Sequence, residues 1–123
     1  DSSIKILSYN NAIGTESAIN FAAVASGANY TKGGITFRRS LSAGRGDIHF
    51  LNDNNTDSGN ANTTDDTKMI IKSDGDVGIG TTDPKSKLQV VGLSSYSDNA
   101  AAISGGLTVG AFYHTSGNLK VVI

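Results

Sequence analysis

An apolar–polar–apolar triplet recurs three times in the first half of the chain. Residues 19–21 (Ile-Asn-Phe), 35–37 (Ile-Thr-Phe) and 48–50 (Ile-His-Phe) are separated by stretches rich in Ser and Gly. Side chains alternate between the two faces of a β-strand, so each Ile and Phe shares one face and the polar residue takes the other. The spacing predicts three successive strands whose Ile and Phe side chains build one apolar layer.

A second stretch with strand character covers residues 68–92, KMIIKSDGDVGIGTTDPKSKLQVVG. Its pattern predicts strands at 68–72, 77–80 and 88–91, with a primed hairpin turn at Asp74-Gly75. Because Gly78 and Gly80 share a face of the middle strand, we expect them to leave room for the backbone of another chain. The candidate assembly motif is Asp74, Gly75, Gly78, Gly80 and Pro84.

The remaining elements are predicted less sharply. We expect a first strand at 3–9, a polar loop over 52–66 that projects into solvent, and a final hairpin across 116–118. Residues 18–25 also permit a short helix, although a strong N-cap and charged helix formers are missing. A short helix at 100–103 would be ended by Gly105-Gly106. The expected modules are 1–66 with the triplets and an Asn/Asp-rich loop, 67–92 as a hairpin and trimerisation motif, and 93–123 as a C-terminal β module.

Composition supports strands joined by tight turns. Apolar residues make up 37% of the chain, below the usual share, and Trp and Cys are absent. The polar residues are mainly Asp, Asn, Ser and Thr, which favour turns and caps over helix interiors. A chain with so few core formers gains stability most easily by packing against copies of itself, which also closes its strand edges. The chain opens at Asp1 without Met, and we expect a fragment or a processed product.

Charge and residue chemistry exclude several classes of function. A net charge of −1 leaves no electrostatic footprint for nucleic acid, and no apolar run is long enough for membrane insertion. His49 and His114 lie outside any metal-ligand spacing, and we expect no cofactor, no metal and no enzymatic activity. Asp53, Asn55 and Asp57 have the alternate spacing of ligands in a calcium-binding loop. The glycine that follows is one position late, however, and Thr64 stands where the final Glu ligand belongs. Arg45-Gly46-Asp47 matches an integrin-binding tripeptide and is interpreted as a turn entering a strand.

Residues 75–84, Gly-Asp-Val-Gly-Ile-Gly-Thr-Thr-Asp-Pro, followed by Lys-Leu-Gln-Val at 87–90, resemble a signature of bacteriophage tail fibres and related appendage proteins. That signature is close to GNVGIGTTSP…KLHVxG, and it also occurs in bacterial surface proteins. Other resembling segments are 33–37, 44–50, 69–71 and 109–122. The resemblance implies an all-β fibrous fold in which three identical chains intertwine as a β-prism or triple β-helix. In such proteins the region is often found upstream of a self-cleaving chaperone domain.

The expected function is therefore a structural subunit of a phage tail fibre or similar virion appendage that supports attachment to the host surface. The expected partners are two further copies of the chain, other virion or fibre subunits, and a glycan or protein receptor. Tyr96, Tyr113 and His114 are candidate receptor contacts, with packing between subunits as the alternative for the aromatic side chains. The alternatives in function are a self-assembling extracellular bacterial filament or adhesin and, less favoured, a polysaccharide depolymerase.

Overall fold

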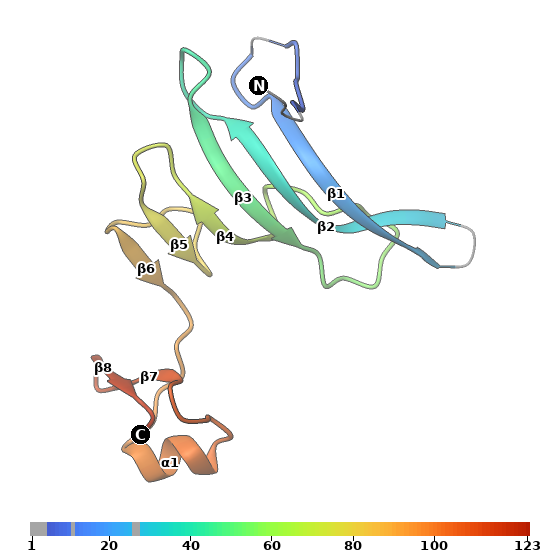
Figure 1. Ribbon diagram of the computed structural model, residues 1–123. Helices are drawn as coiled ribbons and strands as arrows, with labels where there is room; N and C mark the ends of the chain where they lie inside the picture. The colour runs from blue at the N-terminus through green and yellow to red at the C-terminus, as the bar shows by residue number, and fades with distance from the viewer. Residues whose placement is uncertain (1–4, 11, 26–27) are drawn as a thin grey trace. The chain divides into compact units, whose positions relative to one another are not determined.

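The computed structural model describes residues 5–10, 12–25 and 28–123 (Figure 1). The described chain divides into two compact units, Asp1–Val90 and Val91–Ile123. We call them unit 1 and unit 2 and describe each by itself.

Within the described residues, unit 1 forms one sheet of six strands in the order β1-β2-β3-β4-β5-β6 (Figure 1). Neighbours from β1 to β5 are antiparallel, whereas β5 and β6 are parallel. We call it the large sheet. Residues expected as separate modules, 1–66 and 67–92, thus contribute strands to a common sheet. The strands are β1 (Glu16–Ala25), β2 (Ala28–Arg39), β3 (Gly46–Asn52), β4 (Thr67–Ile71), β5 (Val77–Ile79) and β6 (Leu88–Val90).

The three triplets lie on β1, β2 and β3, as their spacing predicted. Ile19 pairs with Ile35, and Ile35 pairs with Phe50, so the triplets stand side by side across the sheet. The helix that residues 18–25 also permitted does not form, because β1 covers them. Alternating branched and aromatic residues favour the pleated surface of a strand, and the cross-strand pairs add to that preference.

The hairpin between β4 and β5 forms where Asp74-Gly75 predicted it, but its turn differs from the primed type. The Gly75 N–H donates to the Lys72 carbonyl at 2.9 Å, and Gly75 has a φ of +88°. Asp74 is not among the residues with positive φ, whereas a type I′ turn needs positive φ at both central positions. The arrangement is a turn of residues 72–75 closed by a glycine bulge, in which Gly75 supplies the left-handed conformation.

One segment of unit 1 differs from the sequence prediction, and a second agrees with it only in part. The strand expected at 3–9 does not form over Lys5–Tyr9, which lie outside the described strands; residues 3 and 4 lie outside the described residues. The polar loop after β3 is exposed over residues 54–60, as expected, but it is also attached to the sheet. The Ala61 N–H donates to the Thr31 carbonyl at 2.7 Å, and Asp53 and Asp66 are buried. Asn and Asp side chains bond readily to nearby backbone, which lets a segment whose only apolar residue is Ala61 attach to a polar sheet face.

Unit 2 combines a short helix with a hairpin. Helix α1 (Asn99–Ser104) begins after Asp98, whose carboxylate accepts from the Ala101 N–H at 2.8 Å. Strands β7 (Phe112–Thr115) and β8 (Asn118–Val121) pair across Ser116 and Gly117, which both have positive φ. This hairpin does have the primed geometry, and the sequence predicted its position.

The core of unit 2 is small and involves both the helix and the hairpin. Ala102, Tyr113 and Val122 form its buried cluster, and the Tyr96 ring meets the Tyr113 ring edge-on at 6.1 Å between centroids. A Cβ on Gly105 would overlap the Tyr96 ring, so the glycine that ends the helix also makes room for this packing.

The prediction of a mainly β protein is confirmed in this coarse sense, since the described residues form open sheets and one short helix. No helix among them is long and apolar enough to cross a membrane.

Candidate assembly surface

One face of the large sheet carries two apolar rows that run across its strands. Paired residues of neighbouring strands lie on the same face, so the registers define each row directly. The first row is Ile19, Ile35, Phe50, Met69, Ile79 and Val90. The second row is Phe37, Ile48, Ile71, Val77 and Leu88, with Ser17 at its β1 end. We call this the apolar face.

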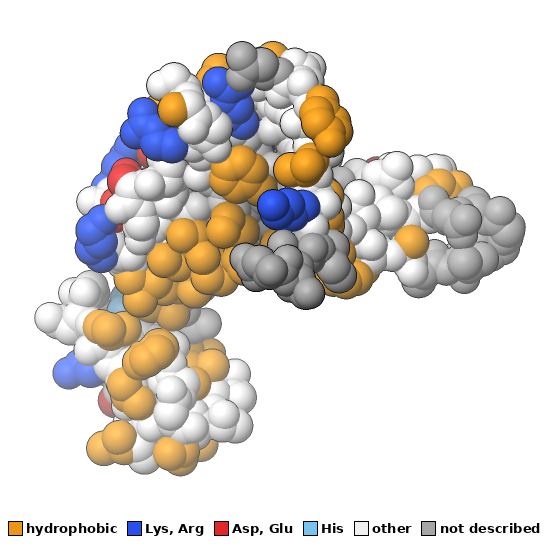
Figure 2. Space-filling view, turned by 45° about the horizontal axis from the view of Figure 1, so that its top comes forward, with side chains coloured by type: hydrophobic (Ala, Val, Ile, Leu, Met, Phe, Trp, Pro, Cys, Tyr) orange, Lys and Arg blue, Asp and Glu red, His pale blue; other side chains and the backbone are white. Residues whose placement is uncertain are grey.

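The apolar face is not covered in the single chain. Ile19 is 50% exposed, Ile79 41% and Leu88 62%, although a sheet face with this composition normally forms a core. Figure 2 shows hydrophobic side chains gathered into a continuous patch over the large sheet. Large contiguous apolar patches are rare on monomeric proteins and mark interaction sites, so this face is a candidate interaction surface.

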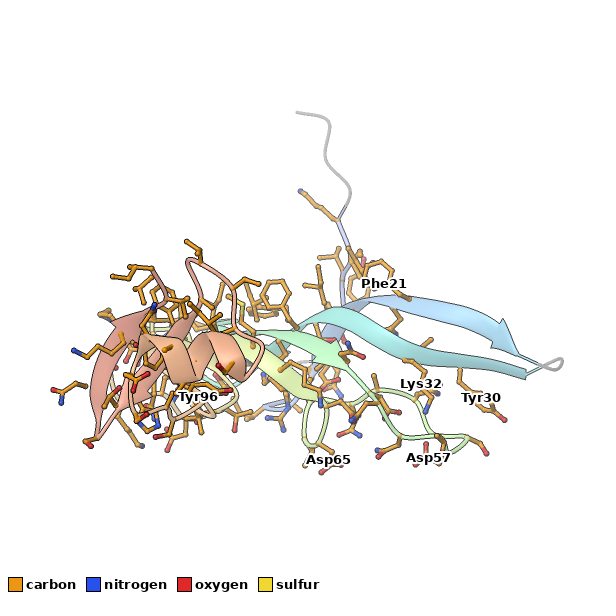
Figure 3. All side chains as sticks on the ribbon, turned by 90° about the horizontal axis from the view of Figure 1, so that it is seen from below. Phe21, Tyr30, Lys32, Asp57, Asp65 and Tyr96 are labelled. Atoms are coloured by element: carbon orange, nitrogen blue, oxygen red, sulfur yellow. The ribbon has the colours of Figure 1, made fainter. Side chains whose placement is uncertain are left out.

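The opposite face of the large sheet is mainly polar, yet it is the buried one. Thr36, His49 and Asp47 are at most 5% exposed, and the apolar Leu51 and Ile70 are buried on the same face. Seen edge-on in Figure 3, Phe21 points to one side of the sheet, while Lys32 and the loop residue Asp57 lie on the other. The chain therefore uses its own polar loop to cover the polar face and leaves the apolar face free.

Ion pairs and hydrogen bonds attach the loop to the sheet. The Lys32 ammonium lies 2.7 Å from Asp53 and 3.2 Å from Asp57, and the Thr63 hydroxyl donates to Glu16 at 2.6 Å. The hydrogen bond with Asp53 raises the pKa of Lys32, and the same bond lowers the pKa of Asp53. An ammonium thus occupies the position between carboxylates that the calcium pattern had suggested, and the described residues contain no group of three side chains suited to a metal.

A second set of polar contacts joins β3 to the β4–β5 turn. Burial alone would raise the pKa of Asp47, but the Ser73 N–H at 2.8 Å and the Lys72 ammonium at 3.1 Å outweigh it and lower that pKa. Asp47 is 4% exposed, so the carboxylate of the Arg-Gly-Asp sequence is engaged inside the chain. The tripeptide is a strand entry, as interpreted from the sequence.

His49 is buried in the polar face with one ring nitrogen satisfied. Its Nδ1 lies 3.0 Å from the Thr67 hydroxyl, whereas Nε2 is buried and has no hydrogen-bond partner. Burial lowers the pKa of His49 because the charged ring would be poorly solvated there. The side chain is therefore part of the polar packing, and the described residues contain no His/Cys/Asp/Glu cluster suited to a metal ion at this position.

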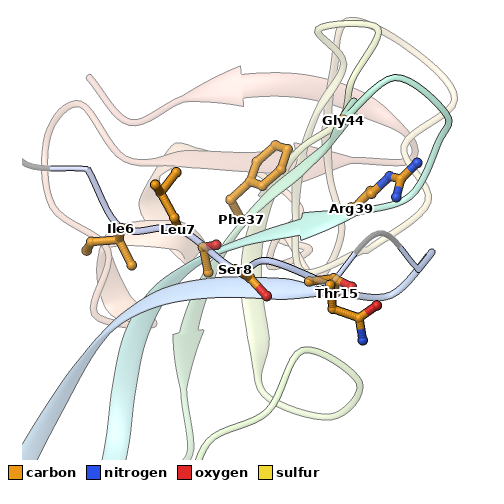
Figure 4. Close-up of a pocket in the computed structure, with 9 residues that line it drawn as sticks. Ile6, Leu7, Ser8, Thr15, Phe37, Arg39 and Gly44 are labelled. Carbon is orange, nitrogen blue, oxygen red and sulfur yellow. The ribbon is translucent and has the colours of Figure 1, made fainter.

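The N-terminal segment borders the apolar face at its β1–β2 end. A cavity of about 440 Å³ lies between Ile6 and Leu7 on one side and Phe37 on the other (Figure 4). Thr15 and Arg39 line its remaining walls. The cavity mixes apolar and polar walls and borders the second row of the apolar face at Ser17 and Phe37.

The residues of the candidate assembly motif have roles within the chain itself. A Cβ on Gly78 would overlap the Thr81 carbonyl oxygen, so the backbone that approaches this glycine belongs to the same chain. Gly80 takes a φ of +71° as the chain leaves β5, and Pro84 is buried in the connection to β6. Asp74 accepts from the Asp76 N–H at 3.1 Å within the β4–β5 turn. Their part in assembly stays a prediction.

The three candidate receptor contacts all lie in unit 2. Tyr113 is 3% exposed and belongs to the core, so its side chain is not accessible to a receptor. Tyr96 packs against it and is half-buried. His114 is also half-buried, and its Nδ1 has no hydrogen-bond partner.

Sequence reasoning missed how far the apolar face extends. Residues of β4, β5 and β6, such as Met69, Ile79 and Val90, continue the first row beyond the triplets. The signal was present in the period-two alternation of 69–71 and 77–79, but the register that joins these strands to β3 depends on long-range pairing. Comparisons with protein-family models and with curated proteins found no match for this chain.

Proposed function

We propose that the chain is a structural subunit of a phage tail fibre or similar virion appendage, which assembles as a homotrimer and supports attachment to a host surface. The uncovered apolar face carries the proposal. Its rows contain Ile, Phe, Val, Leu and Met with no charged residue, so identical copies meet there without like-charge repulsion. Burial of such a surface in a symmetric oligomer is the common way in which a chain satisfies it.

Two further features support an appendage subunit. The resemblance of residues 75–90 to tail-fibre sequences implies three copies around an axis. The polar face carries a loop rich in Asn, Asp and Thr, side chains that bond to sugar hydroxyls, and several weak contacts on one rigid object give strong binding through avidity. In this arrangement the apolar faces lie inward and the polar loops face outward to the host.

The test is the mass and symmetry of the purified chain. Sedimentation equilibrium is expected to give three times the chain mass of 12.6 kDa, and electron microscopy a particle with threefold symmetry. A filament that lengthens with concentration would instead favour the bacterial surface filament. A stable monomer at all accessible concentrations would overturn the proposal.

A further inference from the structure

Unit 2 has an outer apolar surface of its own, separate from the apolar face of the large sheet. Phe112 pairs with Val121, and His114 pairs with Leu119, so these four side chains share one face of the β7–β8 hairpin. Tyr113 lies on the other face, toward α1 and the core. Phe112 is 58% exposed, Leu119 64% and Val121 44%. We call these four residues the outer hairpin face.

The size of unit 2 makes an uncovered face costly. Val91–Ile123 is shorter than the roughly 40 residues below which disulfides, metals or oligomerisation are usually needed for a stable fold. The chain has no cysteine, and the described residues include no metal-binding cluster. The buried cluster of Ala102, Tyr113 and Val122 is small. Cover from elsewhere in the same chain or from a further copy of it is the means of stabilisation that remains.

We infer that the outer hairpin face packs against the outer hairpin faces of the other copies of this chain, so that unit 2 is a self-association module in its own right. This inference rests on the proposed homotrimer. There, each unit 2 is tethered directly after β6 of an assembled large sheet, which holds the copies at an effective concentration in the millimolar range. Phe112, Leu119 and Val121 are apolar, and His114 lies within the same face as an interface residue.

Hydrogen exchange on the full chain tests the inference. Phe112→Ser combined with Leu119→Ser should lower the protection of backbone amides in residues 91–123 at least tenfold, while unit 1 keeps the chain trimeric. Val109→Ser is the matched control, because Val109 is 77% exposed and lies outside the outer hairpin face. Unchanged protection in the double variant would overturn the inference and leave the proposed function standing.

Cross-linking tests the same contact without destabilising unit 2. In this chain, which lacks cysteine, Leu119→Cys treated with a short bismaleimide should give covalent dimers, whereas Val109→Cys should give few. Equal yields from the two variants would overturn the inference.

Dilution separates a second copy from cover supplied within one chain. Protection of residues 91–123 should fall together with the sedimentation mass as the trimer dissociates. Full protection in the dissociated chain would overturn the inference, and a chain that is monomeric throughout would overturn the proposed function as well.

Discussion

Replacing Ile35 by Thr should weaken assembly far more than it weakens the folded chain. Ile35 lies in the first row, between Ile19 and Phe50, and is 39% exposed. Full burial of an Ile side chain is worth roughly 1.5–3 kcal/mol, so the fraction still exposed holds about 0.6–1.2 kcal/mol that assembly would recover. A buried hydroxyl without a partner adds about 1 kcal/mol of cost. Thr keeps the β-branched shape and with it the strand preference.

The loss is multiplied by the symmetry of the assembly. About 2 kcal/mol per chain becomes about 6 kcal/mol per trimer, which is about four orders of magnitude in the trimerisation constant. Because the half-dissociation concentration of a trimer varies as the square root of that constant, it should rise about 100-fold. Sedimentation velocity over a dilution series measures this concentration directly.

Leu41→Thr is the matched control for this experiment. Leu41 is 40% exposed, so its replacement removes about as much buried apolar surface within the chain as replacement of Ile35 does. It lies in the β2–β3 loop, outside both rows. Both variants should therefore lose similar monomer stability. If their half-dissociation concentrations are equal, the apolar face is not the surface on which copies of the chain meet.

Three further predictions concern contacts inside unit 1. Gly78→Ala should cost about 1–3 kcal/mol of unfolding free energy in the dissociated chain, because its Cβ overlaps the Thr81 carbonyl; chemical denaturation measures this, and an unchanged midpoint refutes it. Lys32→Met should speed amide exchange in the loop 53–66 severalfold, whereas removal of the exposed Lys85 charge should not. If the loop exchanges equally fast in both variants, the Lys32 ion pair does not hold it against the sheet. Burial lowers the folded-state pKa of His49 below its ordinary 6.5, so stability is present above that pH and is lost as the pH falls below it. His49→Gln should flatten the stability profile in that window, and a retained slope would assign it to another group.

Local sequence patterns predicted the positions of the strands better than they predicted the contacts between distant segments. The triplets at 19–21, 35–37 and 48–50 placed β1, β2 and β3 and the shared face of their Ile and Phe residues, because alternation is a property of each strand alone. The Ser116–Asn118 turn was predictable for the same reason. The parallel pairing of β5 with β6 was not, since it depends on the path of residues 80–87 around Gly78.

The loop 53–66 shows a different limit of sequence reasoning. Its composition gave the correct predictions that it is not a strand and that most of its residues are exposed, but not its attachment to the sheet. That attachment depends on partners distant in sequence, such as Thr31 and Glu16, which accept hydrogen bonds from Ala61 and Thr63. No local pattern records such partners.

The two faces of the large sheet differ in what they stabilise: contacts on the polar face stabilise the single chain, and burial of the apolar face would stabilise the assembly. Within one chain, the polar face combines the buried side chains of Leu51 and Ile70 with hydrogen bonds and ion pairs around Asp47 and His49, each of which adds little net free energy. A further hydrophobic contribution lies in side chains such as Ile19 and Leu88, which stay exposed until a partner covers them. Folding and assembly should therefore be coupled, so that the melting temperature rises with protein concentration as mass action requires. In a chain covered on both faces the melting temperature would not depend on concentration, and the apolar rows would then need another explanation.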